Sequence, residues 1–398
     1  MKAFIKLVLL TPIFFMLGGC WDRIELNDLA LITALAFDKG ENNQIQVTAQ
    51  TIIPQSQGGG AAMGGGTGGT GGAGRRTTIR SDKGINIAEA LSKLQRKVPR
   101  KQFWGQCKIF IFSEELAKSG IQEHFDFLIR HPQQRERAYV FVSKGMAADV
   151  LELYPPIERS SAEVLRKLSD LETGIRVNLE QLSIMLKGDS RTAVLPLVYV
   201  LPKNKSSEPF QTIPYILGTA VFNKDKMVGE ISEKMTRGVM WVRNEIKEYT
   251  VTFHAEGSEG LVSLSPVKAK VNLIPKIAGE QWIMNIKVHT EGNLVQNGTI
   301  MNPTNPELLK TLEKAYARDV RERIELAMDE AQHKLKVDIF DFSKEFHRKY
   351  PKQWEQAKDN WDQIFPEIQV HTEVEAQITS PGNINAPGGM PKEEVKEK

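Results

Sequence analysis

Several stretches of the chain arrange apolar residues in ways that predict strands. Residues 29–37 form an apolar run, a turn sequence follows at 38–43, and apolar and polar residues then alternate over 45–53. This two-residue period after a turn predicts an antiparallel hairpin. The continuous apolar runs at 107–112 and 138–142 are typical of strands that are buried on both faces.

Residues 263–380 have the most regular pattern. Three alternating stretches begin near Val267, Trp282 and Ile368, and each predicts a half-buried strand. Between the second and third, a helix of about 30 residues, or roughly 45 Å, is expected from Pro306. Its apolar stripe consists of Leu308, Leu312, Tyr316, Val320, Ile324, Met328, Ala331 and Leu335. One stripe implies one buried face, so we expect an antiparallel sheet packed with one long helix.

The remaining signals divide the chain into domains. A serine followed by two glutamates at 113–115 predicts the start of a helix, and two more helices are expected near 160–172 and 178–186. The polar, proline-bearing stretch 201–214 predicts a domain boundary. We therefore expect an α+β protein of three domains with mixed or antiparallel sheets. These are an N-terminal α+β domain at 20–205, a small middle domain at 210–262 and a C-terminal domain at 263–380, followed by a disordered tail at 381–398.

A glycine-rich segment interrupts the N-terminal domain. Residues 58–74 contain eleven glycines and almost no large apolar side chain, which predicts a flexible loop. Gly64, Gly66 and Gly69 match the GxGxxG pattern, but only through composition, because no helix is expected directly behind them. We therefore reject a dinucleotide-binding site at this loop.

The N-terminus has the pattern of an export signal. Two lysines lie within the first six residues, and an apolar run follows at 7–17 that is too short to span a bilayer. The run ends in LGGC at 17–20, which resembles the lipobox of bacterial lipoproteins. We expect residues 1–19 to be a lipoprotein signal peptide, and Cys20 to carry a covalent lipid. The alternatives are an ordinary signal peptide and an uncleaved anchor.

Charge and cysteine content exclude several function classes. The net charge is +3, and loss of the leader removes two lysines and no acid, which leaves +1 and gives no reason to expect a nucleic-acid partner. Only Cys20 and Cys107 are present, so lipidation of the first leaves no intramolecular disulfide. Cys107 lies in an apolar run and is predicted to be a buried core residue.

The sequence shows no recognisable catalytic or metal motif. The seven histidines have no zinc-ligand spacing, and GxSxG, P-loop and HExxH patterns are missing from the sequence. We expect no catalytic residue, no metal and no cofactor other than the lipid on Cys20. The prediction is a non-enzymatic protein.

The residues directly after the lipidated cysteine have two interpretations each. Trp21 is suited to the headgroup level of a membrane, but packing under the first strand explains it equally well. Asp22, Arg23 and Glu25 are candidates for contact with a membrane or partner. A solvated start of the chain is the interpretation that we favour for these three.

Three further sets of residues are singled out by the sequence: a basic cluster, one arginine and a pair of tryptophans. A basic cluster lies on the helix expected from Ile87 and directly after it. It is suited to anionic lipid, although we favour a solvated helix face. This cluster consists of Lys93, Arg96, Lys97, Arg100 and Lys101. Arg237 could bind a carboxylate ligand, but we favour a structural ion pair. Trp354 and Trp361 are seven residues apart, which predicts that both pack one helical face against the sheet.

Four segments of the chain form a recognisable set. The first is CWDRIEL from Cys20, and the second is residues 130–145. The third, residues 218–238, contains GTAVF, MVG and TRG, and the fourth, residues 338–366, contains DIFDF, Pro351, both tryptophans and a closing FP. In this order, the four segments resemble the Ger(x)C spore germination lipoproteins, the C subunits of germinant receptors, whose opening is CWDxxEL.

The resemblance implies a three-domain α+β lipoprotein on the outer face of the spore inner membrane. It would act with two integral membrane receptor subunits, of A and B type, in a receptor that responds to small nutrients. The implied work is receptor assembly or signal relay, and we do not expect direct small-molecule binding. The alternative is a lipid-anchored solute-binding protein of a transporter, but the expected strands and long helix at 263–380 do not fit two α/β lobes.

Overall fold

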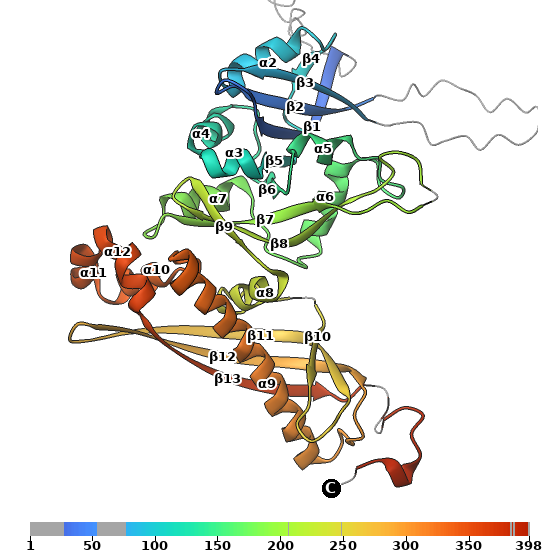
Figure 1. Cartoon of the computed structure of the whole chain (residues 1–398), viewed down its shortest axis with the longest axis vertical. Helices are drawn as coiled ribbons and strands as arrows, with labels where there is room; N and C mark the ends of the chain where they lie inside the picture. The colour runs from blue at the N-terminus through green and yellow to red at the C-terminus, as the bar shows by residue number, and fades with distance from the viewer. Residues whose placement is uncertain are drawn as a thin grey trace, which may run out of the picture.

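The computed structural model describes residues 28–53, 77–205, 207–247, 249–382, 384 and 387–396. The signal peptide and the glycine-rich loop predicted at 58–74 lie outside these residues. The described residues form a mixed α+β fold with a nine-stranded sheet and a four-stranded sheet, as expected from the sequence. Figure 1 shows the larger sheet in the upper part of the view and the smaller sheet below it.

The nine-stranded sheet is mixed. Its order is β3-β2-β1-β5-β6-β7-β8-β9, with β4 paired to the beginning of β1. The predicted hairpin is confirmed as the antiparallel pair of β1 and β2, whereas β1, β5, β6 and β7 run parallel. The strands are β1 (Leu29–Lys39), β2 (Ile45–Ile52), β3 (Thr77–Gly84), β4 (Lys101–Phe103), β5 (Ile109–Ser113), β6 (Tyr139–Ser143), β7 (Thr192–Val200), β8 (Pro214–Asn223) and β9 (Lys226–Ile231).

Short helices cover this sheet. They are α2 (Ile87–Gln95), α3 (Glu114–Ser119), α4 (Gln122–Arg130), α5 (Ala147–Glu152), α6 (Ser161–Asp170) and α7 (Leu179–Lys187). Ser113 caps α3 as predicted, because its Oγ accepts the Leu116 N–H at 3.4 Å. The buried Asp38 accepts the Ala147 and Ala148 N–H groups at the start of α5, at 2.6 and 3.0 Å.

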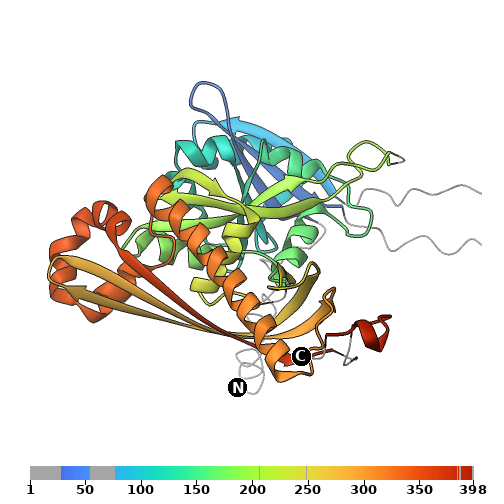
Figure 2. The same ribbon diagram turned by 60° about the horizontal axis from the view of Figure 1, so that its bottom comes forward.

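The four-stranded sheet confirms the strands and the long helix predicted at 263–380. Its strands are β10 (Val251–His254), β11 (Leu261–Ala278), β12 (Gln281–Asn297) and β13 (Gln369–Ser380), in that order. Helix α9 (Pro306–Asp329) continues to Leu335 as a π-helical segment, η2 (Glu330–Leu335). Figure 2 shows α9 running diagonally across one face of the sheet. Every residue of the predicted stripe is buried, except the partly exposed Leu335.

The expectation of a purely antiparallel C-terminal sheet is wrong for its last strand. β13 pairs parallel with β12, with Ile283 opposite Gln369 and Gly292 opposite Ile378. The physical reason is the connection: α9 runs back across the sheet, so the chain returns to the starting end of β12 before β13 begins (Figure 1). Alternation shows which face of a strand is buried, but not the direction of its neighbour.

The segment predicted as a small middle domain, 210–262, forms no sheet of its own. β8 pairs antiparallel with β7 and β9 pairs with β8, so both strands extend the larger sheet. β10 instead pairs with β11 in the smaller sheet. Helix α8 (Glu233–Val242) lies between the two sheets. β8 joins the larger sheet because pairing with the edge of β7 satisfies its backbone groups, and β9 then pairs with the free edge of β8.

The region after α9 folds into short helices rather than the single one expected around the two tryptophans. These are α10 (Phe342–Lys349), α11 (Pro351–Ala357), η3 (Lys358–Asn360), α12 (Trp361–Ile364) and η4 (Phe365–Glu367). Trp354 and Trp361 are both buried, with ring centroids 5.0 Å apart, but they lie on α11 and α12. Trp361 lies 5.8 Å from Trp282 of β12, so only the predicted packing toward the sheet is confirmed.

Part of the predicted disordered tail is ordered. A short 3-10 helix, η5, spans Lys392–Glu394. The Lys396 N–H donates to the Ile300 carbonyl at 2.7 Å, and its carbonyl accepts the Asn302 N–H at 3.1 Å. Val395 is buried. The composition of residues 381–398 concealed this contact, because two backbone hydrogen bonds and one apolar side chain leave little trace in a polar segment.

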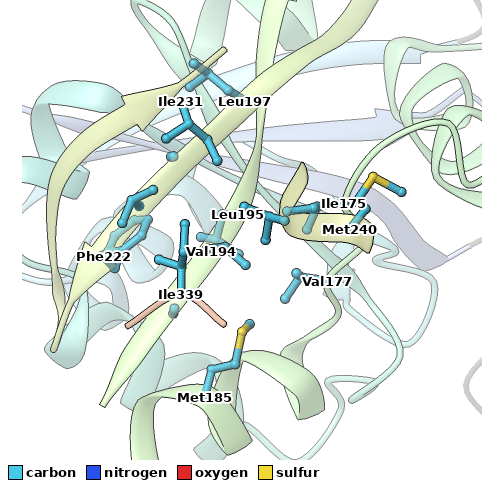
Figure 3. Close-up of a cluster of buried hydrophobic side chains, with 14 of the residues drawn as sticks. Ile175, Val177, Met185, Val194, Leu195, Leu197, Phe222, Ile231, Met240 and Ile339 are labelled. Carbon is cyan, nitrogen blue, oxygen red and sulfur yellow. The ribbon is translucent and has the colours of Figure 1, made fainter. Parts of the chain in front are cut away.

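One hydrophobic core joins the two halves. Figure 3 shows side chains of β7, β8, β9, α7 and α8 in a single buried cluster, together with Ile339 from the C-terminal half. Ile339 is 1% exposed. A residue that follows α9 therefore completes the core of the larger sheet, and the two halves are not independent bodies.

Candidate functional site: the junction of the two halves

The residues predicted to contact membrane or partner lie outside the described residues. These are Cys20, Trp21, Asp22, Arg23 and Glu25. The described chain begins at Asp28, directly before β1. The structured candidate for function is therefore the junction between the two sheets, where residues of two of the motif segments, 218–238 and 338–366, meet.

Helices α8 and α9 cross at backbone contact. A Cβ atom added to Gly238 would lie 2.1 Å from the carbonyl oxygen of Arg323 and 2.9 Å from Cβ of Ala327. No side chain larger than hydrogen fits at this position. Gly229 of β9 meets the end of the same long helix, because an added Cβ there would lie 2.5 Å from Cδ2 of Leu335. Both glycines belong to the segment 218–238, and both are explained by close packing.

Arg237 makes the structural ion pair that the sequence predicted. Its guanidinium lies 3.3 Å from a carboxylate oxygen of Glu233 and 4.5 Å from the centre of the Tyr249 ring. The side chain is buried, and the neighbouring Thr236 hydroxyl lies 2.9 Å from that of Thr219 on β8. Arg237 therefore ties α8 to the segment that leads into β10.

Asp338 is a buried anchor for the turn that ends the long helix. Its carboxylate accepts the backbone N–H groups of Phe342 at 3.0 Å and Ser343 at 2.8 Å, and the indole N–H of Trp361 at 3.1 Å. The carboxyl is 2% exposed, and burial raises its pKa to about 6 although these donors lower it. One aspartate thereby organises α10 and α12.

The same turn is attached to the larger sheet. The Thr192 hydroxyl at the start of β7 donates to the backbone carbonyl of Asp338 at 2.6 Å. Arg243, just after α8, binds Glu245 at 2.9 Å and lies 3.9 Å from Asp341. Burial opposes the charge of Arg243, but the two acids more than offset this and raise its pKa. The Thr192–Asp338 and Arg243–Asp341 contacts join residues that are far apart in sequence.

The cavities near this junction offer no reactive cluster. One cavity of about 620 Å³ lies between the end of α8, β11 and α10, and Arg243 and Lys344 line it alongside Glu245, Asp341 and Glu345. Arg243 pairs with Glu245 at 2.9 Å, and Arg348 pairs with Glu345. These lining groups are therefore bound to each other, and they do not form the nucleophile and base arrangement that acyl transfer requires.

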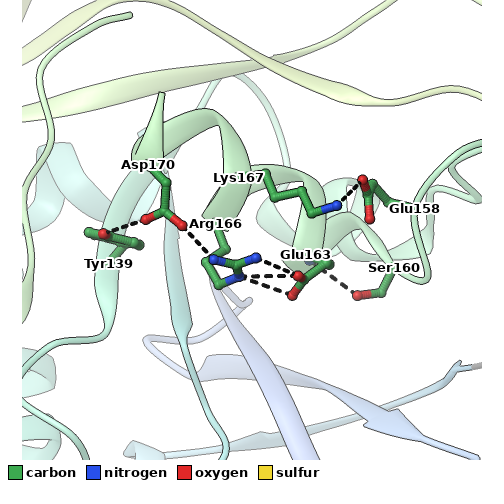
Figure 4. Close-up of polar contacts among 7 residues, drawn as sticks. All are labelled: Tyr139, Glu158, Ser160, Glu163, Arg166, Lys167 and Asp170. Carbon is green, nitrogen blue, oxygen red and sulfur yellow. Dashed lines mark hydrogen bonds and ion pairs between the residues drawn. The ribbon is translucent and has the colours of Figure 1, made fainter. Parts of the chain in front are cut away.

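A second cavity of about 630 Å³ lies beside α6, and its charges are largely paired. Figure 4 shows that Lys167 contacts Glu158, and that Arg166 bridges Glu163 and Asp170. The Ser160 hydroxyl caps the helix by accepting the Glu163 N–H at 3.2 Å. These groups serve the helix rather than a substrate.

The described residues contain neither a metal-binding cluster nor a membrane-spanning helix. No group of three or more His, Cys, Asp or Glu side chains within them is placed to hold a metal ion. Over the same part of the chain, no helix is both long and apolar enough to cross a bilayer. The buried Cys107 is 0% exposed, and burial raises its pKa to about 12, as expected for a core thiol.

Comparison with known proteins defines the class. Residues 22–200 match the family model of the spore germination protein N-terminal domain, and residues 217–382 match the model described as spore germination B3/GerAC like, C-terminal. These two domains define a spore germination protein. The chain belongs to the Ger(x)C family.

Individual relatives match along nearly the whole chain. Spore germination protein KC of Bacillus subtilis (strain 168) is 26% identical over 405 residues, which cover 97% of each chain. Spore germination protein B3 of the same organism is 24% identical and covers 93% of this chain and 97% of its own. The crystal structure of the GerBC protein has a TM-score of 0.56 at 21% identity, over 87% of this chain and 96% of that one, and shows the same fold.

The sequence indicates which segments form this junction, but not which of their residues contact each other. Gly238 and Asp338 lie in motifs that resembled the family, and an aspartate beside the apolar Ile339 and Phe340 is a signal for a buried carboxylate. Thr192 was missed, because a threonine at the start of a strand has no local feature that indicates a partner 146 residues away.

Proposed function

We propose that this chain is the lipid-anchored, non-enzymatic C subunit of a spore nutrient germinant receptor. The observation that supports this most strongly is the match of both family domains, in order, over residues 22–200 and 217–382. Its relatives carry spore germination in their names, and they align over nearly their full length. The role we assign is receptor assembly or the relay of a state change.

The anchor in this proposal is the lipid on Cys20. Each buried methylene contributes about 0.8 kcal/mol, so one acyl chain binds marginally, whereas two or three hold a protein stably on a membrane. Anchoring on the outer face of the spore inner membrane would confine the chain to the plane that holds its integral membrane partners, of A and B type. Confinement of this kind raises the effective concentration of the partners without any new contact.

The junction of the two halves suits relay better than catalysis. Gly238 and Arg323 hold two helices at backbone contact, and Asp338 joins α10, α12 and β7 through buried hydrogen bonds. Packed interiors transmit displacement because they deform little. A partner that moves the second sheet would therefore also move the larger sheet. This property fits a subunit that communicates between neighbours.

The anchor can be tested with one substitution and one matched control. Spores that express Cys20→Ala should incorporate no labelled fatty acid into the protein, lose it from the membrane fraction and germinate poorly with nutrients. Cys107→Ala replaces the other cysteine, which is buried, and should keep the label and the location. Incorporation of label that survives Cys20→Ala refutes the anchor.

The partners require a separate experiment. The protein should be isolated by affinity from detergent-extracted spore membranes, and the co-purifying chains identified. Two integral membrane germinant-receptor subunits should accompany the wild-type chain. A transporter permease in their place would instead support a solute-binding protein, and tight one-to-one calorimetric binding of a nutrient would strengthen that outcome.

A further inference from the structure

The beginning of the described chain lies beside the basic cluster. β4 pairs parallel with the first residues of β1, with Leu29 opposite Lys101 and Leu31 opposite Phe103. Leu29 follows Cys20 by nine positions, so nine Cα–Cα steps join them. Even fully extended, they span at most about 30 Å. An anchor at Cys20 therefore keeps this end of the protein close to the membrane surface.

Three cations at this end have no acidic partner. Arg96, Arg100 and Lys101 make no salt bridge to any described residue, whereas Lys93 pairs with Glu89 at 2.9 Å and Lys97 pairs with Asp82 at 3.0 Å. We call Arg96, Arg100 and Lys101 the basic end. Within the described chain, one acid, Asp28, directly precedes β1 at this end. A net positive charge remains where the tether begins.

The basic end lies at one extremity of the fold. Figure 1 shows α2 and β4 at the top of the molecule, opposite the second sheet and α9. Arg96 directly follows the last residue of α2, and Lys101 is the first residue of β4. Regular structure therefore fixes the position of the backbone at both residues. Arg96 and Lys101 are exposed. Their charge is therefore available to a partner outside the chain.

We propose that the basic end lies against anionic phospholipid headgroups and holds the protein upright, with the second sheet away from the membrane. The proposal deepens the proposed function and rests on its anchor at Cys20. Anionic headgroups attract basic residues near a membrane surface, and each one strengthens binding about fivefold. Tethering supplies the proximity, and the basic end supplies the orientation.

A fluorophore at position 92 can report this orientation. Ser92 is exposed, one helical turn before Arg96, and Ser92→Cys adds a single reactive thiol because Cys107 is fully buried. The full lipidated chain is reconstituted on vesicles that contain nitroxide-labelled headgroups. One set is phosphatidylcholine, and the other holds equal parts of phosphatidylcholine and phosphatidylglycerol. Gln377→Cys, exposed on β13, gives the label at the opposite end.

Matched variants separate the basic end from net charge. Arg96→Gln with Lys101→Gln removes two exposed cations at the basic end, and Lys203→Gln with Lys205→Gln removes two exposed cations elsewhere. We expect stronger quenching at position 92 on the anionic vesicles, and weaker quenching as salt screens the charges. The first pair should weaken the headgroup contact about 30-fold, and the second should leave it unchanged.

Each contrary result has a distinct meaning. Equal quenching at position 92 on both vesicle types overturns the orientation and leaves the anchor intact. A wild-type chain that stays on neither vesicle type overturns the anchor and this inference with it. If composition has no effect, but the Arg96 and Lys101 variant loses its co-purifying proteins, the basic end meets protein and the lipid contact is refuted.

Discussion

The backbone of Gly238 in α8 lies directly against the carbonyl oxygen of Arg323 in α9, with no room between them for a methyl group. This contact joins the helix between the two sheets to the helix that covers the second sheet. The junction therefore depends on a missing side chain, and adding one is a direct way to disturb it.

Gly238→Ala should destabilise the protein by about 2 kcal/mol. An added methyl group would force the helices apart, and overpacking of this kind costs roughly 1–3 kcal/mol, partly offset by the better helix propensity of alanine. Denaturant unfolding would measure the change. Gly174→Ala is the control, because its added Cβ would lie 3.5 Å from Cγ2 of Ile216, an ordinary contact. Equal stability of Gly238→Ala and wild type would show that the helices are not held at this distance.

Asp338 should make stability depend on pH in the mildly acidic range. Its pKa is raised from 3.8 to about 6 by burial, so the folded state holds a proton that the unfolded chain releases. The resulting stabilisation is complete below about pH 4 and is lost as the pH rises through about 6, a total of about 3 kcal/mol.

Asp338→Asn should remove this dependence. The free energy of unfolding, measured between pH 4 and 7, should lose the part of its slope that wild type shows in this window. Asp362→Asn changes an exposed acid nearby and should keep the slope. If the wild-type and Asp338→Asn profiles run parallel, the carboxyl does not titrate in this range.

Trp361→Phe should cost about 2 kcal/mol more than Trp354→Phe. Both indoles are buried, but only Trp361 donates to Asp338, at 3.1 Å. A hydrogen bond to a charged group is worth about 1.5–3 kcal/mol, and its loss adds to the packing defect common to both changes. Thermal or denaturant unfolding of the two variants would test the difference. Equal destabilisation would mean that the indole N–H contributes little.

Cys107 should be unreactive until the protein unfolds. It is fully buried, and burial raises its pKa to about 12, so almost no thiolate exists at neutral pH. The lipidated chain should show no maleimide-reactive thiol when folded and one in denaturant, and Cys107→Ala should show none in either state. Labelling of folded Cys107→Ala would reveal a free thiol at Cys20 and contradict lipidation.

Much of the fold followed from local patterns. The alternation near Val267, Trp282 and Ile368 predicted three strands, and the stripe from Leu308 predicted α9 and its buried face. Such patterns are reliable because a half-buried element must repeat its apolar positions with its own geometric period. The cap at Ser113 was predictable for the same reason, since both partners lie within one turn.

What the patterns could not show was the choice of neighbours. The pattern of β8 and β9 predicted a separate unit, but β8 pairs with β7 and β9 pairs with β8, so both extend the larger sheet. β13 runs parallel to β12 because α9 returns the chain to the start of β12. Nothing in a strand's own periodicity names its partner or the partner's direction. The two tryptophans were expected on one helix because a spacing of seven fits one helical face equally well.

The sequence by itself determined the more regular elements, the buried face of strands and helices such as α9, and the family to which the chain belongs. Only the tertiary structure decided three contacts. Thr192 donates a hydrogen bond to Asp338, Gly238 lies against the backbone of α9 at Arg323, and Lys101 pairs with Leu29 between β4 and β1. Periodicity and capping arise within a few residues of chain. These three contacts join residues 72 to 146 positions apart, or depend on how close two backbones come, so they exist only once the packed core brings the segments together.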